Sequence, residues 1–313
     1  MKIAEIAWKI YFSLPPAVRQ QLRILLKGGA GHTSSLFNNV IATRDARGKC
    51  RIDRAARVFG EYLTASGIGG IEGRRCLEIG TGYVGSSPVV MWLLGASTVT
   101  SVDLNRLLVP SALRESVLSV KKAELHDILK KHTRSEESLG GRIEEVYAWA
   151  GSERGDLPGW FDYLAPFDLL TSEPPHAFDF IYSASTLEHI PRSLVGRFVG
   201  KTASISADGG VGLHFIDLKD HFDSEVNPLG FLALQDGEYS DDAQADSRGN
   251  RIRGRQWLDV FSDSGLTAEI AMSSRAPRSQ LPDSLAVPFR GMDAQDLLLT
   301  SVVVRAQKKS QSS

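Results

Sequence analysis

The stretch Leu77-Glu78-Ile79-Gly80-Thr81-Gly82-Tyr83-Val84-Gly85 decides the expected fold. It contains the end of a short apolar run, 75–79, that predicts a strand, and it leads into a helix for which Ser87 is the expected N-cap and Pro88 the first residue. Its three glycines have the spacing G-x-G-x-x-G, which lets a backbone turn tightly and approach a ligand closely. This strand, turn and helix predict a nucleotide-binding unit, and a plain turn between a strand and a helix is the alternative.

Further strands and helices alternate on both sides of that turn. Apolar runs predict seven strands, at 75–79, 98–102, 163–165, 178–183, 211–216, 266–272 and 298–305. Helical patterns fill the intervals, and the long gap after the second strand predicts a helical insertion at about 106–160. Such alternation is typical of an α/β protein with a doubly wound, right-handed sheet.

Two carboxylates near the turn indicate which nucleotide it binds. Asp103 follows the second strand and can accept hydrogen bonds from both ribose hydroxyls of an adenosine cofactor. Glu78 lies two residues before Gly80, where a carboxylate would repel a pyrophosphate but attract the sulfonium and ammonium of S-adenosyl-L-methionine. The alternative is an NAD(P)-dependent oxidoreductase, for which we find no catalytic Tyr/Lys or Cys/His constellation.

The segment 77–82 resembles motif I of class I S-adenosylmethionine-dependent methyltransferases. The segment 102–104 resembles the acidic motif of their second strand, 163–168 resembles the third-strand block, and 178–190 resembles the fourth-strand block. The resemblance implies a Rossmann-like sheet in the order 3-2-1-4-5-7-6 whose last strand is antiparallel.

The resemblance also implies a set of cofactor contacts. The glycine turn would approach the methionine part and the ribose, and other residues would meet the adenine edge and the sulfonium. The implied residues are Glu78, Gly80, Thr81, Gly82, Asp103, Leu104, Asp168, Leu169 and Ser183. An exposed turn is the alternative interpretation for Asp168.

The expected methyl acceptor is an oxygen of a small molecule or saccharide, such as a surface-glycan precursor. The fourth strand continues into 183–186, which is not the Asn/Asp-Pro-Pro-aromatic motif of enzymes that methylate exocyclic amines of nucleobases. The chain has 36 Lys and Arg against 37 Asp and Glu, whereas nucleic-acid-binding proteins carry a clear basic excess.

A hydroxyl acceptor benefits from a general base, and ligands bind beyond the carboxyl ends of the strands. His221 follows the fifth strand and is the preferred base, with His189 and Asp217 as further catalytic candidates. The alternatives are that these residues cap a helix and face solvent, or that the chain is a non-catalytic cofactor-binding scaffold for a partner methyltransferase.

No resident metal is expected. Some quinone-forming methyltransferases bind a divalent metal through Glu-x-x-Glu-His, but Ser185 occupies the first acidic position here. Asp217, Asp220 and His221 are the alternative set of hard ligands.

The expected organisation has three parts. An N-terminal helical extension covers 1–60, a methyltransferase domain covers 61–307, and 308–313 form a flexible tail. Within the domain, a lid-like loop at about 218–256 carries arginines that could bind a phosphate or carboxylate on the acceptor, unless it is a solvated loop.

The expected location is the cytoplasm, because the N-terminus lacks a signal peptide and no apolar run approaches the ~20 residues that span a bilayer. Residues 1–30 combine basic and aromatic side chains, which predicts peripheral membrane contact; packing on the domain or dimer formation is the alternative. The oligomeric state stays open.

Overall fold

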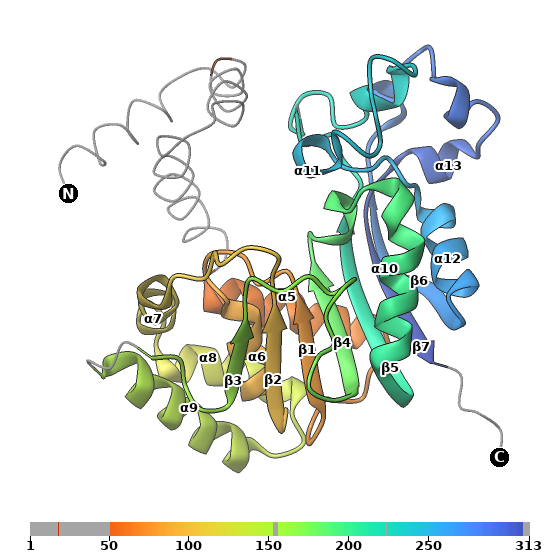
Figure 1. The fold of residues 1–313 in the computed structure, drawn as a ribbon. Coiled ribbons are helices and arrows are strands. Elements are labelled where there is room, and N and C mark those ends of the chain that lie inside the picture. Colours follow the sequence, from red (N-terminus) through yellow and green to blue (C-terminus); the bar gives the residue numbers. More distant parts are fainter. Residues whose placement is uncertain (1–17, 19–50, 153–155, 223, 309–313) are drawn as a thin grey trace.

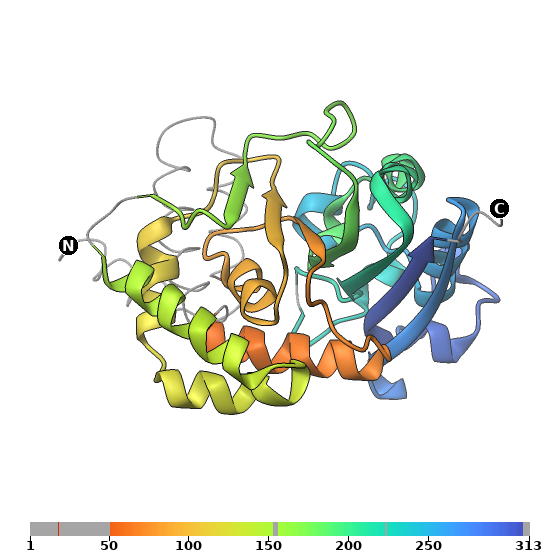
Figure 2. The same ribbon diagram turned by 90° about the horizontal axis from the view of Figure 1, so that it is seen from below.

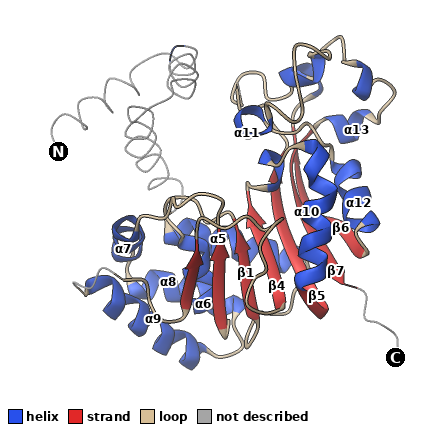
Figure 3. Cartoon of the chain, in the orientation of Figure 1, coloured by secondary structure: helices blue, strands red, loops and turns tan. Residues whose placement is uncertain are grey.

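The computed structural model describes residue 18 and residues 51–152, 156–222 and 224–308. They form one seven-stranded sheet in the order β3-β2-β1-β4-β5-β7-β6 (Figures 1 and 3). Only β7 runs antiparallel to its neighbours in this sheet. The predicted fold class, strand order and antiparallel last strand are confirmed. The strands are β1 (Arg75–Ile79), β2 (Thr98–Val102), β3 (Phe161–Leu164), β4 (Phe178–Ala184), β5 (Ser206–Asp217), β6 (Leu266–Arg275) and β7 (Leu299–Lys308).

The first helix after the glycine turn begins earlier than predicted. Helix α6 (Ser86–Leu93) has Gly85 as its N-cap, in the left-handed conformation with φ 66°, and no side chain caps it. Gly85 can adopt this conformation without a Cβ clash, so the chain enters the helix before Ser87. The N-cap predicted at Ser87 is therefore wrong.

The interval between β2 and β3 holds three α-helices, namely α7 (Pro110–Leu118), α8 (Lys122–Leu129) and α9 (Glu136–Gly151), and a short 3-10 helix, η2 (Lys130–His132). Arg142 anchors α9 to α6, because its guanidinium lies 3.9 Å from the centre of the Trp92 ring and donates to the carbonyls of Trp92 and Ala96. Stacking and two hydrogen bonds from one arginine hold α9 against α6 and the turn that follows it.

The two faces of the sheet are covered differently (Figure 2). Helices α5 (Ile52–Ala65), α6, α8 and α9 share one apolar cluster on one face. The other face carries α10 (Arg192–Ile205) and α12 (Gly254–Asp263). Leu169 and Phe167, from the connection between β3 and β4, pack there against Leu77 and Ile79 of β1.

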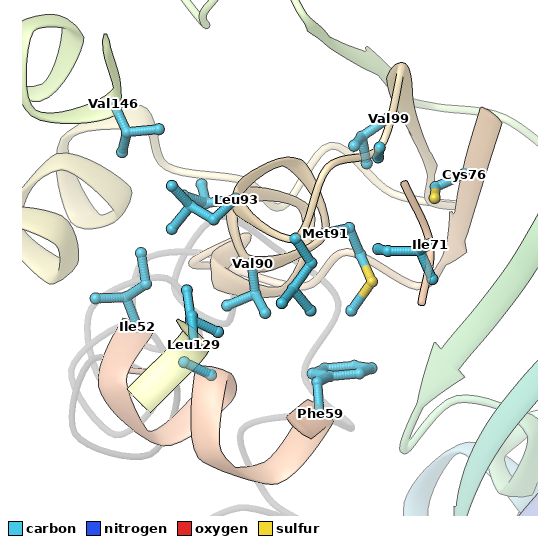
Figure 4. Packing of buried hydrophobic residues seen from close by; sticks show 14 of the residues in the cluster. Ile52, Phe59, Ile71, Cys76, Val90, Met91, Leu93, Val99, Leu129 and Val146 are labelled. Atoms are coloured by element: carbon cyan, nitrogen blue, oxygen red, sulfur yellow. The ribbon is translucent and has the colours of Figure 1, made fainter. Parts of the chain in front are cut away.

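Helix α5 is part of this core, although the sequence places its first residues in the N-terminal extension. Figure 4 shows Ile52 and Phe59 of α5 beside Val90, Met91 and Leu129. The Phe59 ring also meets the Tyr182 ring of β4 edge to face at 5.5 Å. The domain therefore reaches back to residue 52, and the rest of the expected extension lies outside the described residues, apart from residues 18 and 51.

Two segments form a small lobe beyond the carboxyl ends of β4 and β5 (Figure 1). One follows β5 and contains η4 (Gly230–Ala233) and α11 (Ala245–Arg248). The other joins β6 to β7 through η5 (Arg278–Gln280), η6 (Val287–Phe289) and α13 (Ala294–Leu297). They share an apolar cluster that includes Phe231, Tyr239 and Phe289, so most of the segment expected as a lid-like loop is packed.

Within the described ranges, none of the helices is long and apolar enough to cross a bilayer.

The place of α5 in the core predicts a stability effect. Phe59 is 3% exposed, so Phe59→Ala should lower the free energy of unfolding by about 3–5 kcal/mol, the usual cost of truncating a buried aromatic residue. Leu118→Ala, at a side chain that is 52% exposed, should change it by less than about 0.5 kcal/mol. Denaturant unfolding measures both, and equal effects would place α5 outside the cooperative core.

Candidate cofactor and catalytic site

The glycine turn after β1 leaves room for a ligand. Gly80 and Gly82 have φ of 82° and 65°, in the region that favours glycine. The Gly80 amide donates to the Val102 carbonyl at 2.9 Å, and a Cβ on Gly80 would overlap the Thr186 side chain. A Cβ on Gly82 would meet no atom within 4 Å, so the backbone at Gly82 faces open space.

Glu78 lies beneath this turn and is 3% exposed. Burial raises its pKa to about 8, although the Ser101 hydroxyl donates to its carboxyl group. At neutral pH the side chain is therefore mainly protonated in the ligand-free chain, and the fixed negative charge expected there is absent. A cationic ligand would favour ionisation of Glu78, so its binding would be linked to proton release, whereas a pyrophosphate would oppose that ionisation.

Asp103 is tied directly to the glycine turn. Its Oδ2 accepts from the Gly82 amide at 3.1 Å, and its Oδ1 accepts from the Asn105 amide at 3.0 Å. Each carboxylate oxygen keeps a second acceptor site, so ribose hydroxyls can still bind. The structure thus brings together Gly82 and Asp103, two of the predicted cofactor contacts.

The predicted adenine contacts divide into surface and core positions. Leu104 is 64% exposed beside Asp103, as an apolar surface for a base would be. Asp168 accepts from the Leu170 amide at 2.9 Å and so organises the turn after β3. Leu169 is buried in the core, so its side chain supports this turn from below.

Ser183 is also turned into the core. Its side chain is 1% exposed and forms a 2.9 Å hydrogen bond with Nδ1 of His214. Burial lowers the pKa of His214 to about 4, so this imidazole is neutral. Contact between Ser183 and a cofactor would therefore come from the backbone.

A cluster of ionisable side chains lies beyond β4 and β5, and we call Glu188, His189 and His221 the carboxyl-edge cluster. Glu188 and His189 belong to η3 (Leu187–His189), which follows β4, and His221 follows β5. Their potential ligand atoms all lie within 4.8 Å of one another, and the two imidazole rings are 4.9 Å apart. Asp217 lies beside them, with its Oδ2 3.7 Å from His221 Nε2.

Two members of the carboxyl-edge cluster, Glu188 and His221, are mainly uncharged at neutral pH. Burial and then the neighbouring His189 lower the pKa of His221 to about 4, so its imidazole is neutral and a weaker base than free imidazole. Burial raises the pKa of Glu188 to about 8. The structure thus brings together all three predicted catalytic residues, His221, His189 and Asp217, and adds Glu188.

Asn250 holds the η3 turn in place. Its side-chain amide donates to the carbonyls of Leu187 and Ile190, both at 3.0 Å, and its backbone amide donates to the Glu188 carbonyl at 2.8 Å. Glu188 and Asn250 are not among the site residues predicted from the sequence. Glu188 could have been found from its place next to His189, but nothing local to Asn250 indicates a contact some 60 residues away.

A buried ion pair holds the loop that carries His221. Arg248 Nε donates to Asp220 Oδ1 at 2.9 Å, and Arg248 Nη2 donates to Asp220 Oδ2. Asp220 is 2% exposed. The His221 amide donates to the Arg248 carbonyl at 3.2 Å. Asp220, expected as an alternative metal ligand, is therefore committed to Arg248.

Two of the arginines expected to bind the acceptor serve the fold instead. Arg253 is fully buried and donates to the carbonyls of Leu218, Leu297 and Leu299. Arg251 is 3% exposed and pairs with Asp241 at 2.6 Å. The structure does not favour that expectation for Arg251 and Arg253, because the guanidinium of Arg251 pairs with Asp241 and both terminal nitrogens of Arg253 donate to backbone carbonyls.

An open hollow of about 490 Å³ lies on the same segment, lined in part by Arg192, Tyr239, Asp241 and Arg251. Asp241 pairs with both arginines, so the charges are neutralised internally. None of its lining residues belongs to the glycine turn or the carboxyl-edge cluster, and we assign it no role in the reaction.

No protein-family model matches the chain, and no curated protein matches its sequence. The chain is similar to the solved structure of a magnesium protoporphyrin IX methyltransferase from Synechocystis PCC 6803 with bound S-adenosylhomocysteine. The two share 12% identity over 92% of this chain and 93% of that one, with a TM-score of 0.42. A 1,6-didemethyltoxoflavin-N1-methyltransferase from Burkholderia thailandensis has 15% identity over 90% and 92%, with a TM-score of 0.44. The YcgJ protein from Bacillus subtilis has 13% identity over 81% and 100%, also at 0.44. The fold assignment rests on the chain's own strand order rather than on these likenesses.

The raised pKa of Glu78 predicts a pH-dependent stability difference. Between the ordinary carboxyl pKa of about 4.5 and the folded value of about 8, the folded chain holds a proton that the unfolded chain releases. Glu78 therefore makes the wild type less stable as pH rises through that window. Glu78→Gln removes this contribution, so the variant should gain stability relative to the wild type from pH 5 to pH 8. Denaturant unfolding at several pH values measures the difference, and parallel profiles would refute the raised pKa.

Proposed function

We propose that the chain is an S-adenosyl-L-methionine-dependent methyltransferase that transfers a methyl group to an oxygen of a small molecule or saccharide. The observation that carries the proposal is the antiparallel β7 between β5 and β6. A dinucleotide-binding sheet repeats its parallel mononucleotide-binding half in the order 3-2-1-4-5-6. Here β7 interrupts the second half, which favours one nucleoside site, beside β1 and β2.

The predicted contacts give the cofactor a direction along the sheet edge. Asp103 binds the ribose and Leu104 meets the adenine beyond β2, with Asp168 at the adenine edge. The methionine part runs past Gly82 toward β4. Thr186 links these regions, since its hydroxyl donates to the Ile79 carbonyl at 3.1 Å and it lies two residues before Glu188. The methyl group is then directed toward the carboxyl-edge cluster.

Methyl transfer to oxygen is an in-line displacement, so the main tasks are alignment of the reactants and exclusion of water. The acceptor oxygen attacks the methyl carbon, the carbon–sulfur bond breaks, and neutral S-adenosylhomocysteine leaves. The acceptor's proton passes to His221, and the nearby Asp217 carboxylate stabilises the resulting imidazolium.

The net charge of the chain supports a small-molecule or saccharide acceptor. The near-neutral chain has no basic excess for a nucleic acid. The proposed acceptor is a hydroxyl compound, with a surface-glycan precursor as the specific candidate. Peripheral membrane contact through residues 1–30 would suit a lipid-linked precursor, but those residues lie outside the described ranges, apart from residue 18.

The alternatives lose support from specific contacts. An oxidoreductase needs a catalytic constellation beside a nicotinamide, and the second nucleotide-binding half is interrupted by β7. A non-catalytic scaffold would be favoured if His189 and His221 pointed away from the site. Instead their ring nitrogens converge with the Glu188 carboxyl group at the carboxyl edge of the sheet, which supports a shared site.

Ligand binding tests the cofactor assignment. Calorimetry should detect S-adenosylhomocysteine binding to the wild type and no binding of NAD. Asp103→Ala should weaken binding of S-adenosylhomocysteine by about 1–3 kcal/mol, the scale of a hydrogen bond to a charged group. Asp162→Ala, at an exposed position on neighbouring β3, is the matched control and should bind like the wild type. The reverse preference, for NAD over S-adenosylhomocysteine, would rule out the methyltransferase.

Turnover tests the role of His221. An acceptor is first identified by mass spectrometry of labelled methyl transfer. With that acceptor, His221→Ala should have a kcat lower than that of the wild type by about 10²–10⁴, the usual contribution of a general base. Its affinity for S-adenosylhomocysteine should stay unchanged, because His221 lies on the acceptor side. Wild-type turnover in this variant would exclude His221 as the base.

A further inference from the structure

The carboxyl-edge cluster contains a buried carboxyl oxygen without a partner. Glu188 is 1% exposed, and its Oε1 accepts from the Asp217 amide at 3.3 Å. Its Oε2 is buried and has no hydrogen-bond partner among the residues that the structure describes. A buried polar atom left unpaired is costly, which indicates that Oε2 meets a ligand that the described residues do not supply.

The two imidazoles present nitrogen atoms to the same place. Within the described ranges, His221 Nε2 is also buried without a hydrogen-bond partner, and Asp217 Oδ2 lies 3.7 Å from it. His189 has Nδ1 3.4 Å from the Ala245 carbonyl, which favours a proton on Nδ1 and leaves the lone pair of Nε2 free. A carbonyl that orients the opposite ring nitrogen in this way is a usual companion of metal-binding histidines.

The protein builds this arrangement from two separate loops and holds both in place. Asn250 fixes the η3 turn that carries Glu188 and His189. The Arg248–Asp220 pair fixes the loop that carries His221. The three side chains therefore converge from the short 3-10 helix η3 and from the loop after β5, and their potential ligand atoms lie within 4.8 Å of one another.

We propose that Glu188, His189 and His221 bind one divalent first-row transition cation, with Zn²⁺ as the representative, at the carboxyl edge of the sheet. Two imidazole nitrogens with one carboxylate oxygen suit such borderline cations, whereas Mg²⁺ and Ca²⁺ prefer oxygen ligands alone. This differs from the expectation of no metal, and from the alternative set that included Asp220. It uses neither Ser185 nor Asp220.

Three protein ligands leave a coordination position open, as in catalytic rather than structural sites. An acceptor hydroxyl bound there would become more acidic, and because His221 Nε2 would then bind the cation, the released proton would pass to the nearby Asp217 carboxylate rather than to His221. This role toward the acceptor rests on the proposed methyltransferase function, whereas binding of the cation does not.

Cobalt titration of the full chain tests the site directly. Co²⁺ should bind in a ratio of one per chain and produce visible d–d absorption, and Zn²⁺ should displace it whereas Mg²⁺ should not. Glu188→Gln and His221→Ala should weaken binding of Co²⁺ about tenfold or more, since even loss of an outer partner costs 10–100-fold. Excess Zn²⁺ should raise the Tm of the wild type but not that of these variants.

His126→Ala is the matched control, because His126 lies on α8, which packs against α5 and α9. This variant should bind Co²⁺ like the wild type. Far-UV circular dichroism of each variant without metal identifies any that fails to fold; Glu188→Gln is nearly isosteric and serves if His221→Ala does not fold.

Absence of a visible band, or equal affinity in wild type and both variants, overturns the proposal. Binding of S-adenosylhomocysteine without Co²⁺ binding would refute only the metal site, and Co²⁺ binding without S-adenosylhomocysteine binding would refute only the methyltransferase function.

Discussion

The hydrogen bond from the Thr186 hydroxyl to the Ile79 carbonyl joins the two halves of the site. Ile79 is the last residue of β1 and directly precedes the glycine turn, whereas Thr186 directly precedes the turn that carries Glu188 and His189. Gly80 makes the contact possible, because a Cβ there would overlap Thr186. The cofactor turn and the carboxyl-edge cluster are therefore held at a fixed spacing, as a reaction that moves one carbon between two bound molecules requires.

Burial of ionisable groups is the second common theme of the site. Glu78 and Glu188 are both removed from water, and burial raises the pKa of each to about 8. Such groups are costly in a folded chain, and they are typical of sites where a ligand supplies the missing charge. For Glu78 that charge would come from the cofactor, and for Glu188 from a metal cation. The two carboxyl groups thus serve different ligands on either side of Thr186.

The sequence was most informative where local patterns determine structure. Strands β1 and β2 have the predicted bounds, 75–79 and 98–102, because each is a short apolar run with glycine or a charged residue close to its ends. The residues of the glycine turn and Asp103 could be placed for the same reason. The burial of Arg251 and Arg253 could not, because their partners are backbone carbonyls up to 46 residues away along the chain. Asn250 was missed because its contacts with the η3 turn depend on how distant loops meet.

A crystal structure of the chain with S-adenosylhomocysteine would test the account most directly, since it would locate the leaving-group sulfur relative to both halves of the site. We expect the ribose hydroxyls at Asp103, the adenine against Leu104, and the sulfur beyond Gly82 on the side of Glu188 and His221. A ligand bound away from the glycine turn, or one whose sulfur points away from the carboxyl-edge cluster, would contradict the proposed path of the methyl group.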